Sequence, residues 1–290
     1  MTRRILITIE YDGGPFVGWQ RQSNGLSVQA AIEDAALAFV HAPVAVVGAG
    51  RTDSGVHATG QAAHLDVPEK FTASRVMEAL NAHLSSVPIT VQSASEVPED
   101  FHARFSASGR RYLYRILPRR QPPALNRGRV WHHKRKLDPK LMAQAAKHLL
   151  GQHDFTSFRA SQCQAESPHR TLDRLDIEAS GNEIHIHAEA RSFLHHQVRN
   201  IAGTLTLVGT GKWHPDKVKD ALKAADRSAA GPTAPAHGLY LVGVDYLGIQ
   251  ESRAWSIYKS ATSITNDKAM KQAATQPPFP TISRPMRHNQ

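Results

Sequence analysis

Apolar and polar positions alternate in short runs over the first hundred residues, and two longer runs have helical spacing. In residues 3–11, RRILITIEY, isoleucines stand at every second position, which predicts a strand that ends at Asp12-Gly13-Gly14. Ser27 is a suitable N-cap for a helix over 28–40, where apolar residues recur three or four positions apart. We also expect strands at 44–47, 61–67 and 89–95 and a second helix at 73–84.

This order, β-α-β-β-α-β, is typical of the split βαβ arrangement, in which an antiparallel sheet carries its helices on one face. The second half of the chain repeats the order with longer insertions. Asp138 and Pro139 would begin one helix, and apolar residues from Leu194 to Val208 form the stripe of another, with glycines following to end it. The strands that we expect here are 110–117, 172–179, 183–190 and 239–246.

The sequence therefore predicts an α/β (α+β) protein of two similar halves, residues 1–107 and 108–250. Each half would be an antiparallel sheet with helices on one face, and a cleft would lie between the two sheets. After residue 250 the periodicity fades, and the segment 251–290 is expected to be a flexible tail.

Composition narrows the class of protein. The formal net charge of +10 and the pI of about 9.9 favour an acidic partner. Cys163 is the only cysteine, which excludes an internal disulfide and a thiolate zinc cage and fits a reducing cytoplasm. The apolar runs are shorter than the roughly 18 to 20 residues of a membrane span, and charge returns at Glu10 before a secretory leader could form. We therefore expect a cytoplasmic protein without a membrane segment.

The basic charge is concentrated between Asp100 and Asp138, an interval that contains no acidic residue. Its arginines and lysines are interleaved with Tyr112, Tyr114 and Trp131, a composition that suits a polyanion with stackable bases. A solvated basic face without a partner is the alternative. The candidate RNA contacts on the strand at the start of this interval are Arg110, Arg111 and Arg115.

The segment GAGRTDSGVHATGQ, residues 48–61, places Asp53 beside Arg51 in a loop with four glycines. Asp-Ser-Gly is ordinary turn material, and most such aspartates bond only to local backbone amides. The glycines, however, would let a bulky ligand approach the backbone closely. A guanidinium from Arg51 or another arginine would keep the carboxylate ionised and aimed, as a nucleophile or base requires. Together these features favour a reacting group.

Two further side chains have both a structural and a functional interpretation. Arg199 falls with His195 and Thr206 on a helix face away from the apolar stripe, where these residues would line the cleft, although an exposed helix arginine is common. Tyr112 stands in an alternating strand with Tyr114 on the same face, so it could simply pack the sheet.

The histidines suggest a metal site as a competing interpretation. His185 and His187 share one face of a strand, and His195 and His196 open the following helix, so a site of three or four histidines is conceivable. No carboxylate at helical ligand spacing accompanies them. We therefore expect no metal.

The loop that contains Asp53 resembles the active-site motif of the tRNA pseudouridine synthase A family, and the similarity extends over most of residues 4–248. The resemblance implies the pseudouridine synthase fold, in which two α/β halves form a central cleft for RNA. It also implies a homodimeric isomerase that acts without a cofactor on uridines 38, 39 and 40 of the tRNA anticodon stem-loop. Besides GRTDSGVHATGQ (50–61), the similar segments include EYDGGPFVGWQRQ (10–22), DFHARFSASGRRYLYRI (100–116), GQHDFTSFRA (151–160), RSFLHHQVRNIAGTL (191–205) and GLYLVGVDY (238–246).

Carried over position by position, the resemblance makes Asp53 the catalytic aspartate and Tyr112 the tyrosine that stacks on the target base. Arg199 corresponds to the basic residue that pairs with the aspartate, and Arg51 to a support that also contacts RNA. Gln197 departs from the family, which usually has an apolar Met at this position.

Pseudouridine formation breaks the bond from uracil N1 to the ribose, turns the base and rejoins it to the same carbon through C5. A carboxylate could trap an oxocarbenium-like centre, as in glycoside cleavage, or remove the 2′ proton to give a glycal. Both routes remain open, and both require the uridine to leave its stack. The rival classes are a noncatalytic RNA-binding protein and a metal-dependent hydrolase that uses the histidines.

Overall fold

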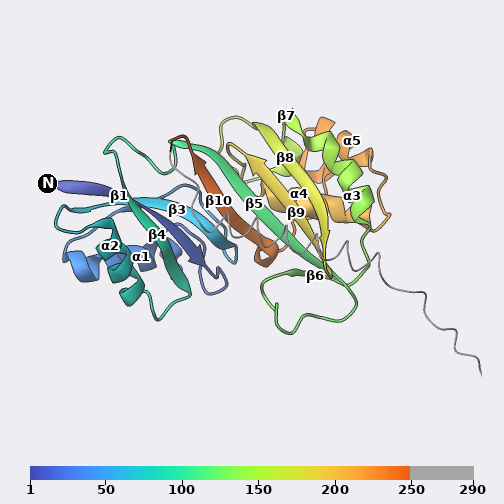
Figure 1. Ribbon diagram of the computed structural model, residues 1–290. Helices are drawn as coiled ribbons and strands as arrows, with labels where there is room; N and C mark the ends of the chain where they lie inside the picture. The colour runs from blue at the N-terminus through green and yellow to red at the C-terminus, as the bar shows by residue number, and fades with distance from the viewer. Residues whose placement is uncertain (249–290) are drawn as a thin grey trace, which may run out of the picture. The chain divides into compact units, whose positions relative to one another are not determined.

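The structure, a computed structural model, describes residues 1–248 (Figure 1), so the expected tail at 251–290 lies outside the described residues. No helix in residues 1–248 is both long and apolar enough to cross a membrane. The strands are β1 (Thr2–Tyr11), β2 (Val46–Gly48), β3 (His57–Pro68), β4 (Ile89–Val97), β5 (Ala107–Pro118), β6 (Trp131–His133), β7 (Gly151–Asp154), β8 (His169–Ser180), β9 (Glu183–Ala190) and β10 (Leu239–Tyr246). The α-helices are α1 (Val28–Val40), α2 (Ala73–His83), α3 (Pro139–Ala146), α4 (Gln197–Gly209) and α5 (Lys217–Lys223), and the 3-10 turns are η1 (Lys147–Leu149), η2 (Thr156–Phe158), η3 (Arg227–Ala229) and η4 (Ala236–Gly238).

The strands form one continuous sheet in the order β4-β1-β3-β10-β5-β9-β8-β7, with β2 paired to β3 and β6 paired to β5. Along one edge, β3 pairs with β2 through residues 63–65 and runs parallel to β10 through residues 57–58. A Cβ atom at Gly60 would lie 2.5 Å from the carbonyl oxygen of Val242, so glycine permits the close approach of β10. The expectation of two separate sheets is therefore corrected, because β10 joins them.

The two halves repeat one strand arrangement. In the sheet of the first half, β1 lies between β4 and β3, and β2 pairs with β3 on its other side. In the sheet of the second half, β5 lies between β10 and β9, and β8 pairs with β9 on its other side. The chain order is also repeated, with α3 and α4 in the places of α1 and α2. The mixed α/β class is confirmed. The division into domains at residue 107 stays a prediction.

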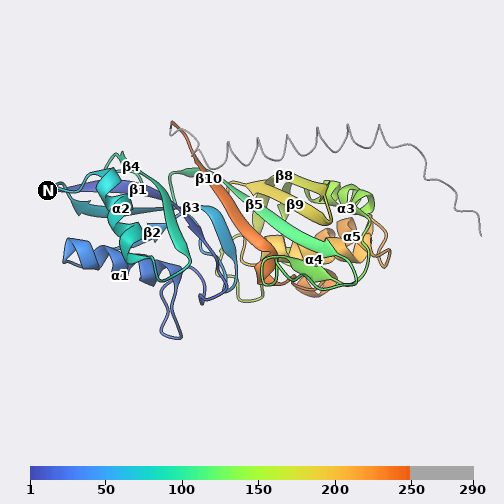
Figure 2. The ribbon, with the colours of Figure 1, turned by 60° about the horizontal axis from the view of Figure 1, so that its bottom comes forward.

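Helices of both halves pack on the sheet through alternate strand residues. Ile5, Ile7 and Ile9 of β1 are fully buried in a core that includes residues of α1 and α2. Tyr114 and Ile116 of β5 are fully buried in a second core with residues of α3 and α4. Figure 2 shows α1 and α4 on the same side of the sheet, one beneath each half.

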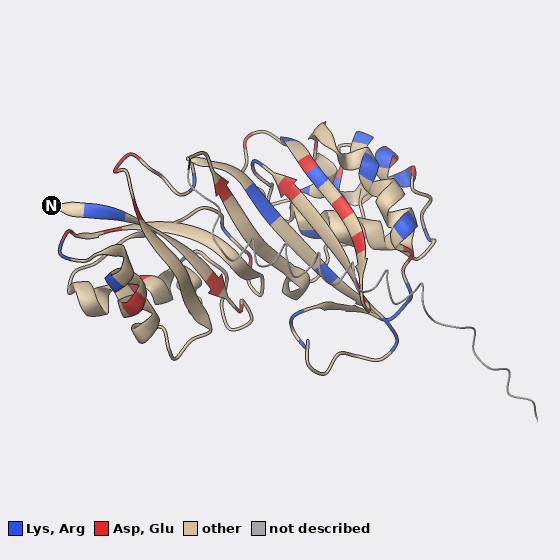
Figure 3. Cartoon of the chain, viewed as in Figure 1, with Lys and Arg blue, Asp and Glu red and all other residues tan. Residues whose placement is uncertain are grey.

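The opposite face of the second half carries paired charges. The guanidinium of Arg115 on β5 donates to both carboxylate oxygens of Glu183 at 2.8 Å, and Arg174 on β8 donates to Glu189 at 2.8 Å. Figure 3 shows both basic and acidic bands along β8. The period of two along these strands thus separates a helix-covered face from a charged face.

Local sequence sets most helix starts. The hydroxyl of Ser27 accepts from the backbone N–H of Ala30, and the carboxylate of Asp138 accepts from that of Lys140, so both predicted N-caps are confirmed. The start of α4 differs from the expectation, since the helix begins at Gln197 and not with the apolar stripe at Leu194.

Candidate active site

Asp53 lies in the loop between β2 and β3, and backbone contacts from the loop after β1 fix its position. The N–H of Trp19 donates to the carbonyl of Thr52 at 3.0 Å, and that of Val56 donates to the carbonyl of Asp53 at 3.1 Å. Gly18 has a φ of +114°, and a Cβ atom there would lie 2.8 Å from the carbonyl oxygen of Thr52. Glycine is therefore required where the two loops meet.

Buried polar side chains support the same loop from the sheet. The hydroxyl of Tyr11 on β1 forms a 2.8 Å hydrogen bond with that of Thr52, next to Asp53. On β3, Gln61 donates its amide to the carbonyl of Gly50 at 2.7 Å. Because these groups are buried, their hydrogen bonds hold the loop in one conformation.

Arg110 on β5 ties the loop to neighbouring segments. Its side chain is buried, and its guanidinium donates to the backbone carbonyls of Ala49, Arg104, Ala107 and Arg191. These contacts orient the loop that contains Asp53. The direct RNA contact expected of Arg110 stays a prediction.

The other two candidate RNA contacts on β5 are also engaged within the fold. The guanidinium of Arg111 lies 3.1 Å from the carboxylate of Asp245 on β10, and Arg115 is held by Glu183. Their roles in RNA binding likewise stay predictions.

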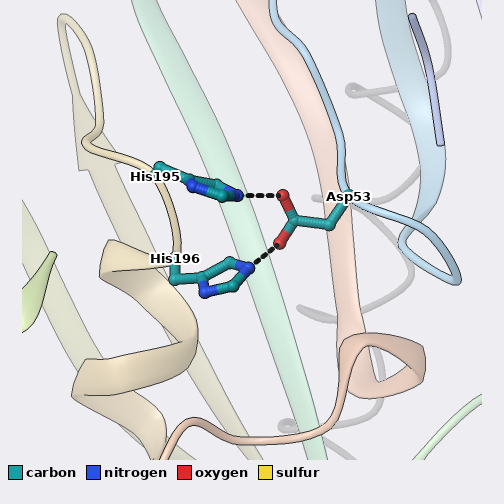
Figure 4. A group of neighbouring side chains, drawn as sticks. All are labelled: Asp53, His195 and His196. Atoms are coloured by element: carbon teal, nitrogen blue, oxygen red, sulfur yellow. Dashed lines mark ion pairs between the residues drawn. The ribbon is translucent and has the colours of Figure 1, made fainter. Parts of the chain in front are cut away.

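Three cationic or hydrogen-bonding side chains surround the carboxylate of Asp53. Arg199, in the first turn of α4, donates from Nη1 to Oδ2 at 2.7 Å, while its Nε donates to the carbonyl of Ala234 at 2.8 Å. Nε2 of His195 lies 3.3 Å from Oδ1, and Nε2 of His196 lies 3.2 Å from Oδ2. Figure 4 shows both imidazoles pointing at the carboxylate.

This environment keeps Asp53 ionised. Burial by itself raises the pKa of the carboxyl group, but the hydrogen bonds and charges of His196 and Arg199 outweigh it and lower the pKa to about 2. Burial lowers the pKa of His195, which Asp53 opposes. A carboxylate of this kind is fully charged at neutral pH and available to react.

Tyr112 stands on the helix-covered face of β5, where its side chain is partly buried. Its ring packs edge-on against Phe193, with ring centroids 5.1 Å apart, and its hydroxyl lies 3.8 Å from where a Cβ of Gly50 would be. Burial, then the charge of Asp53, raises the pKa of Tyr112 to about 12, so the phenol is neutral.

A cleft of about 1240 Å³ brings these residues together. Asp53, Tyr112 and Arg199 line it, and so does the exposed side chain of Arg51. In residues 1–248 the guanidinium that pairs with Asp53 is that of Arg199, not that of Arg51. The segment 162–165, which includes Cys163, also lines the cleft, although no sequence motif indicated it.

The expected helix face needs a correction. Thr206 does not line the cleft, because its side chain is buried and its hydroxyl donates to the carbonyl of Gly203. His195 precedes α4, yet it reaches the cleft through the turn that contains His196. The apolar stripe begins at Leu194, so the sequence pattern did not indicate a turn before the helix.

The two histidine pairs that suggested the competing metal site do not lie together. His185 and His187 lie opposite Arg115 and Leu113 in the sheet, on the face away from Tyr112 and Tyr114. Within the described part of the chain, the group whose ligand atoms come together is Asp53, His195 and His196. The spacing of residues near the histidines could not indicate the carboxylate of Asp53, since Asp53 lies in the other half of the chain.

The chain matches the sequence family described as tRNA pseudouridine synthase over residues 7–106 and 145–247, which include Asp53 and Arg199. This match defines the class of protein, a tRNA-modifying isomerase. The chain therefore belongs to that family and converts uridine in tRNA to pseudouridine.

Curated relatives are similar over most of their length, and each is named tRNA pseudouridine synthase A. The protein of Rhodospirillum rubrum is 56% identical over 245 residues, which cover 84% of this chain and 88% of the relative. That of Paramagnetospirillum magneticum is 57% identical over 243 residues, covering 84% and 95%. A crystal structure of a Cbf5-Nop10-Gar1 complex aligns over 80% of this chain and 69% of its own, with 11% identity and a TM-score of 0.28, a likeness too weak to carry an argument.

Proposed function

We propose that this chain isomerises uridines of the tRNA anticodon stem-loop and that Asp53 is the catalytic group. The observation that carries the proposal is the pairing of Asp53 with Arg199 in a cleft that also exposes Tyr112. Attack at the sugar carbon requires an ionised carboxylate, a fixed cation and a neutral aromatic ring.

In the reaction, the target uridine leaves its stack and enters the cleft, where the ring of Tyr112 packs on its face. The carboxylate of Asp53 then acts at the ribose, either on the anomeric carbon or on the 2′ proton. Since the pKa of Asp53 is about 2, the carboxylate is also a good leaving group when C5 of the turned base attacks the sugar carbon. Arg199 holds the carboxylate in place throughout.

The basic interval supplies the contacts to the RNA backbone in this proposal. Its loop between β5 and β6 is fixed beside the Asp53 loop, because His57 bonds through Nε2 to the carbonyl of Gly128 and Asp12 pairs with Arg129 at 2.9 Å. Arg120 and Arg127 of this loop are exposed. Cations on this loop can neutralise phosphates of a bound tRNA.

We further propose, on the family resemblance, that the enzyme is a homodimer and that it works in the cytoplasm without a cofactor. Size-exclusion chromatography with light scattering measures the mass of the particle and so tests the homodimer. A monomeric mass at micromolar concentration contradicts it.

The test of the assignment is Asp53→Asn, which keeps the size of the side chain and removes its charge. Pseudouridine formation on tRNA is expected to be lost while tRNA affinity stays within a few-fold, because the variant retains the basic surface. Asp66→Asn is the matched control, since Asp66 pairs with Arg4 at the far end of β3. Turnover by Asp53→Asn at the parental rate would refute the role of Asp53.

A further inference from the structure

We propose that Asp53, His195 and His196 form a binding site for a transition-metal cation such as Zn²⁺, and that an ion bound there inhibits the enzyme by occupying the position of the uridine. The ion would be an inhibitor and not a cofactor. Its ligands are one carboxylate and two imidazoles, a set that suits first-row metals with positions left open for water.

The spacing of the three groups fits one ion. Nε2 of His195 and Nε2 of His196 lie 3.3 and 3.2 Å from oxygens of the same carboxylate, and the three ligand atoms lie within 4.8 Å of one another (Figure 4). Zinc bonds to nitrogen and oxygen of about 2.0–2.2 Å place tetrahedral neighbours roughly 3.3 Å apart. An ion can therefore enter with small movements of the side chains.

The backbone at His196 explains how two adjacent histidines reach the same carboxylate. His196 has a φ of +62°, a left-handed conformation that is uncommon for a residue with a side chain. Its ring lies 4.0 Å from that of His195, centroid to centroid. Hydrogen bonds hold this turn, from the N–H of Ala160 to the carbonyl of His195 and from that of Asn200 to the carbonyl of His196. The arrangement is thus preorganised, as a ligand set must be for tight binding.

Each imidazole presents its Nε2 to Asp53, and this nitrogen is the atom that would bind the ion.

Arg199 limits the affinity. Its guanidinium occupies Oδ2 of Asp53 at 2.7 Å, so an ion must share the carboxylate with a positive charge. Removal of this charge is therefore expected to tighten metal binding, although the same change weakens catalysis. Opposite signs for the two effects would distinguish a metal site from a general loss of structure.

The binding experiment uses the metal alone, without tRNA. Co²⁺, a spectroscopic substitute for Zn²⁺, is titrated into the purified full-length chain near neutral pH, and the visible absorption band is followed and then displaced with Zn²⁺. We expect the double variant His195→Gln/His196→Gln to bind at least about tenfold more weakly, since loss even of groups behind the ligands weakens metal binding by that amount. The double variant His185→Gln/His187→Gln, the other histidine pair, is the control and should bind as the parent does.

The proposal is overturned if both double variants give the parental spectrum and affinity. It is also overturned if Arg199→Met, with its fold checked by circular dichroism, binds Co²⁺ more weakly than the parent. The inhibition rests on the proposed function and has its own measurement. Zn²⁺ should slow pseudouridine formation by the parent, with relief by excess tRNA, and inhibition that tRNA does not relieve would refute the competition while leaving the binding result standing.

Discussion

Replacement of Arg199 by Met tests how the site keeps its carboxylate reactive. Methionine retains most of the length and apolar volume of the side chain but removes its charge and its hydrogen bonds. In the parent, Arg199 donates at 2.7 Å to a carboxylate whose side chain is 23% exposed, and a 2.8 Å bond to Ala234 fixes the guanidinium. The variant leaves His195 and His196 as the remaining donors to Asp53.

The expected loss follows from these contacts. A hydrogen bond to a charged group contributes about 1.5–3 kcal/mol. At about 1.4 kcal/mol for each factor of ten, the rate of the chemical step should fall roughly 10- to 150-fold. The pKa of Asp53 should also rise from about 2, because burial, which raises it, is then opposed by fewer groups. Since the proposed reaction needs the ionised form of Asp53, the rate of the variant should begin to fall with decreasing pH at a higher pH than that of the parent.

Single-turnover pseudouridine formation with saturating enzyme, measured by mass spectrometry of the tRNA at several pH values, gives both quantities. Arg174→Met is the matched control, because Arg174 forms comparable ion pairs on the opposite face of the sheet. A rate for Arg199→Met within threefold of the parent, with an unchanged pH profile, would refute the reasoning.

Three other outcomes are expected. The pKa of Glu183 is about 2, against 4.5 for the free group, and its side chain is 13% exposed, so Glu183→Gln should lower the free energy of unfolding by up to about 3 kcal/mol. The depressed pKa means that this stability is present above about pH 4.5 and lost as the pH falls toward 2; urea unfolding that gives the same difference at pH 7 and pH 3 would contradict it. Tyr11→Phe removes the hydrogen bond to Thr52 and keeps the ring, so kcat should fall several-fold with KM unchanged, whereas a change in KM alone would argue against a positioning role. Arg120→Gln/Arg127→Gln should weaken tRNA binding and flatten its dependence on salt, and an unchanged slope would exclude this loop from the RNA interface.

Much of the fold could be predicted because it depends on local patterns. The alternation in β1, the caps at Ser27 and Asp138 and the repeated β-α-β-β-α-β order were readable from neighbouring residues, and the structure confirms them. The joining of both halves into one sheet was not, because β10 pairs with β3 through residues almost two hundred positions apart in the chain.

For the candidate site, too, some features could be predicted from the sequence and others required the structure. The sequence by itself determined that Asp53 stands in a glycine-rich loop, that the chain is basic, and that its motifs are those of a pseudouridine synthase family. The resemblance also named Arg199, 146 residues away, as the partner of Asp53. Only the tertiary structure decided that His195 and His196 meet the same carboxylate. The physical reason is that hydrophobic periodicity and capping are local, whereas the partners of a charge are set by how α4 packs on the sheet across the cleft.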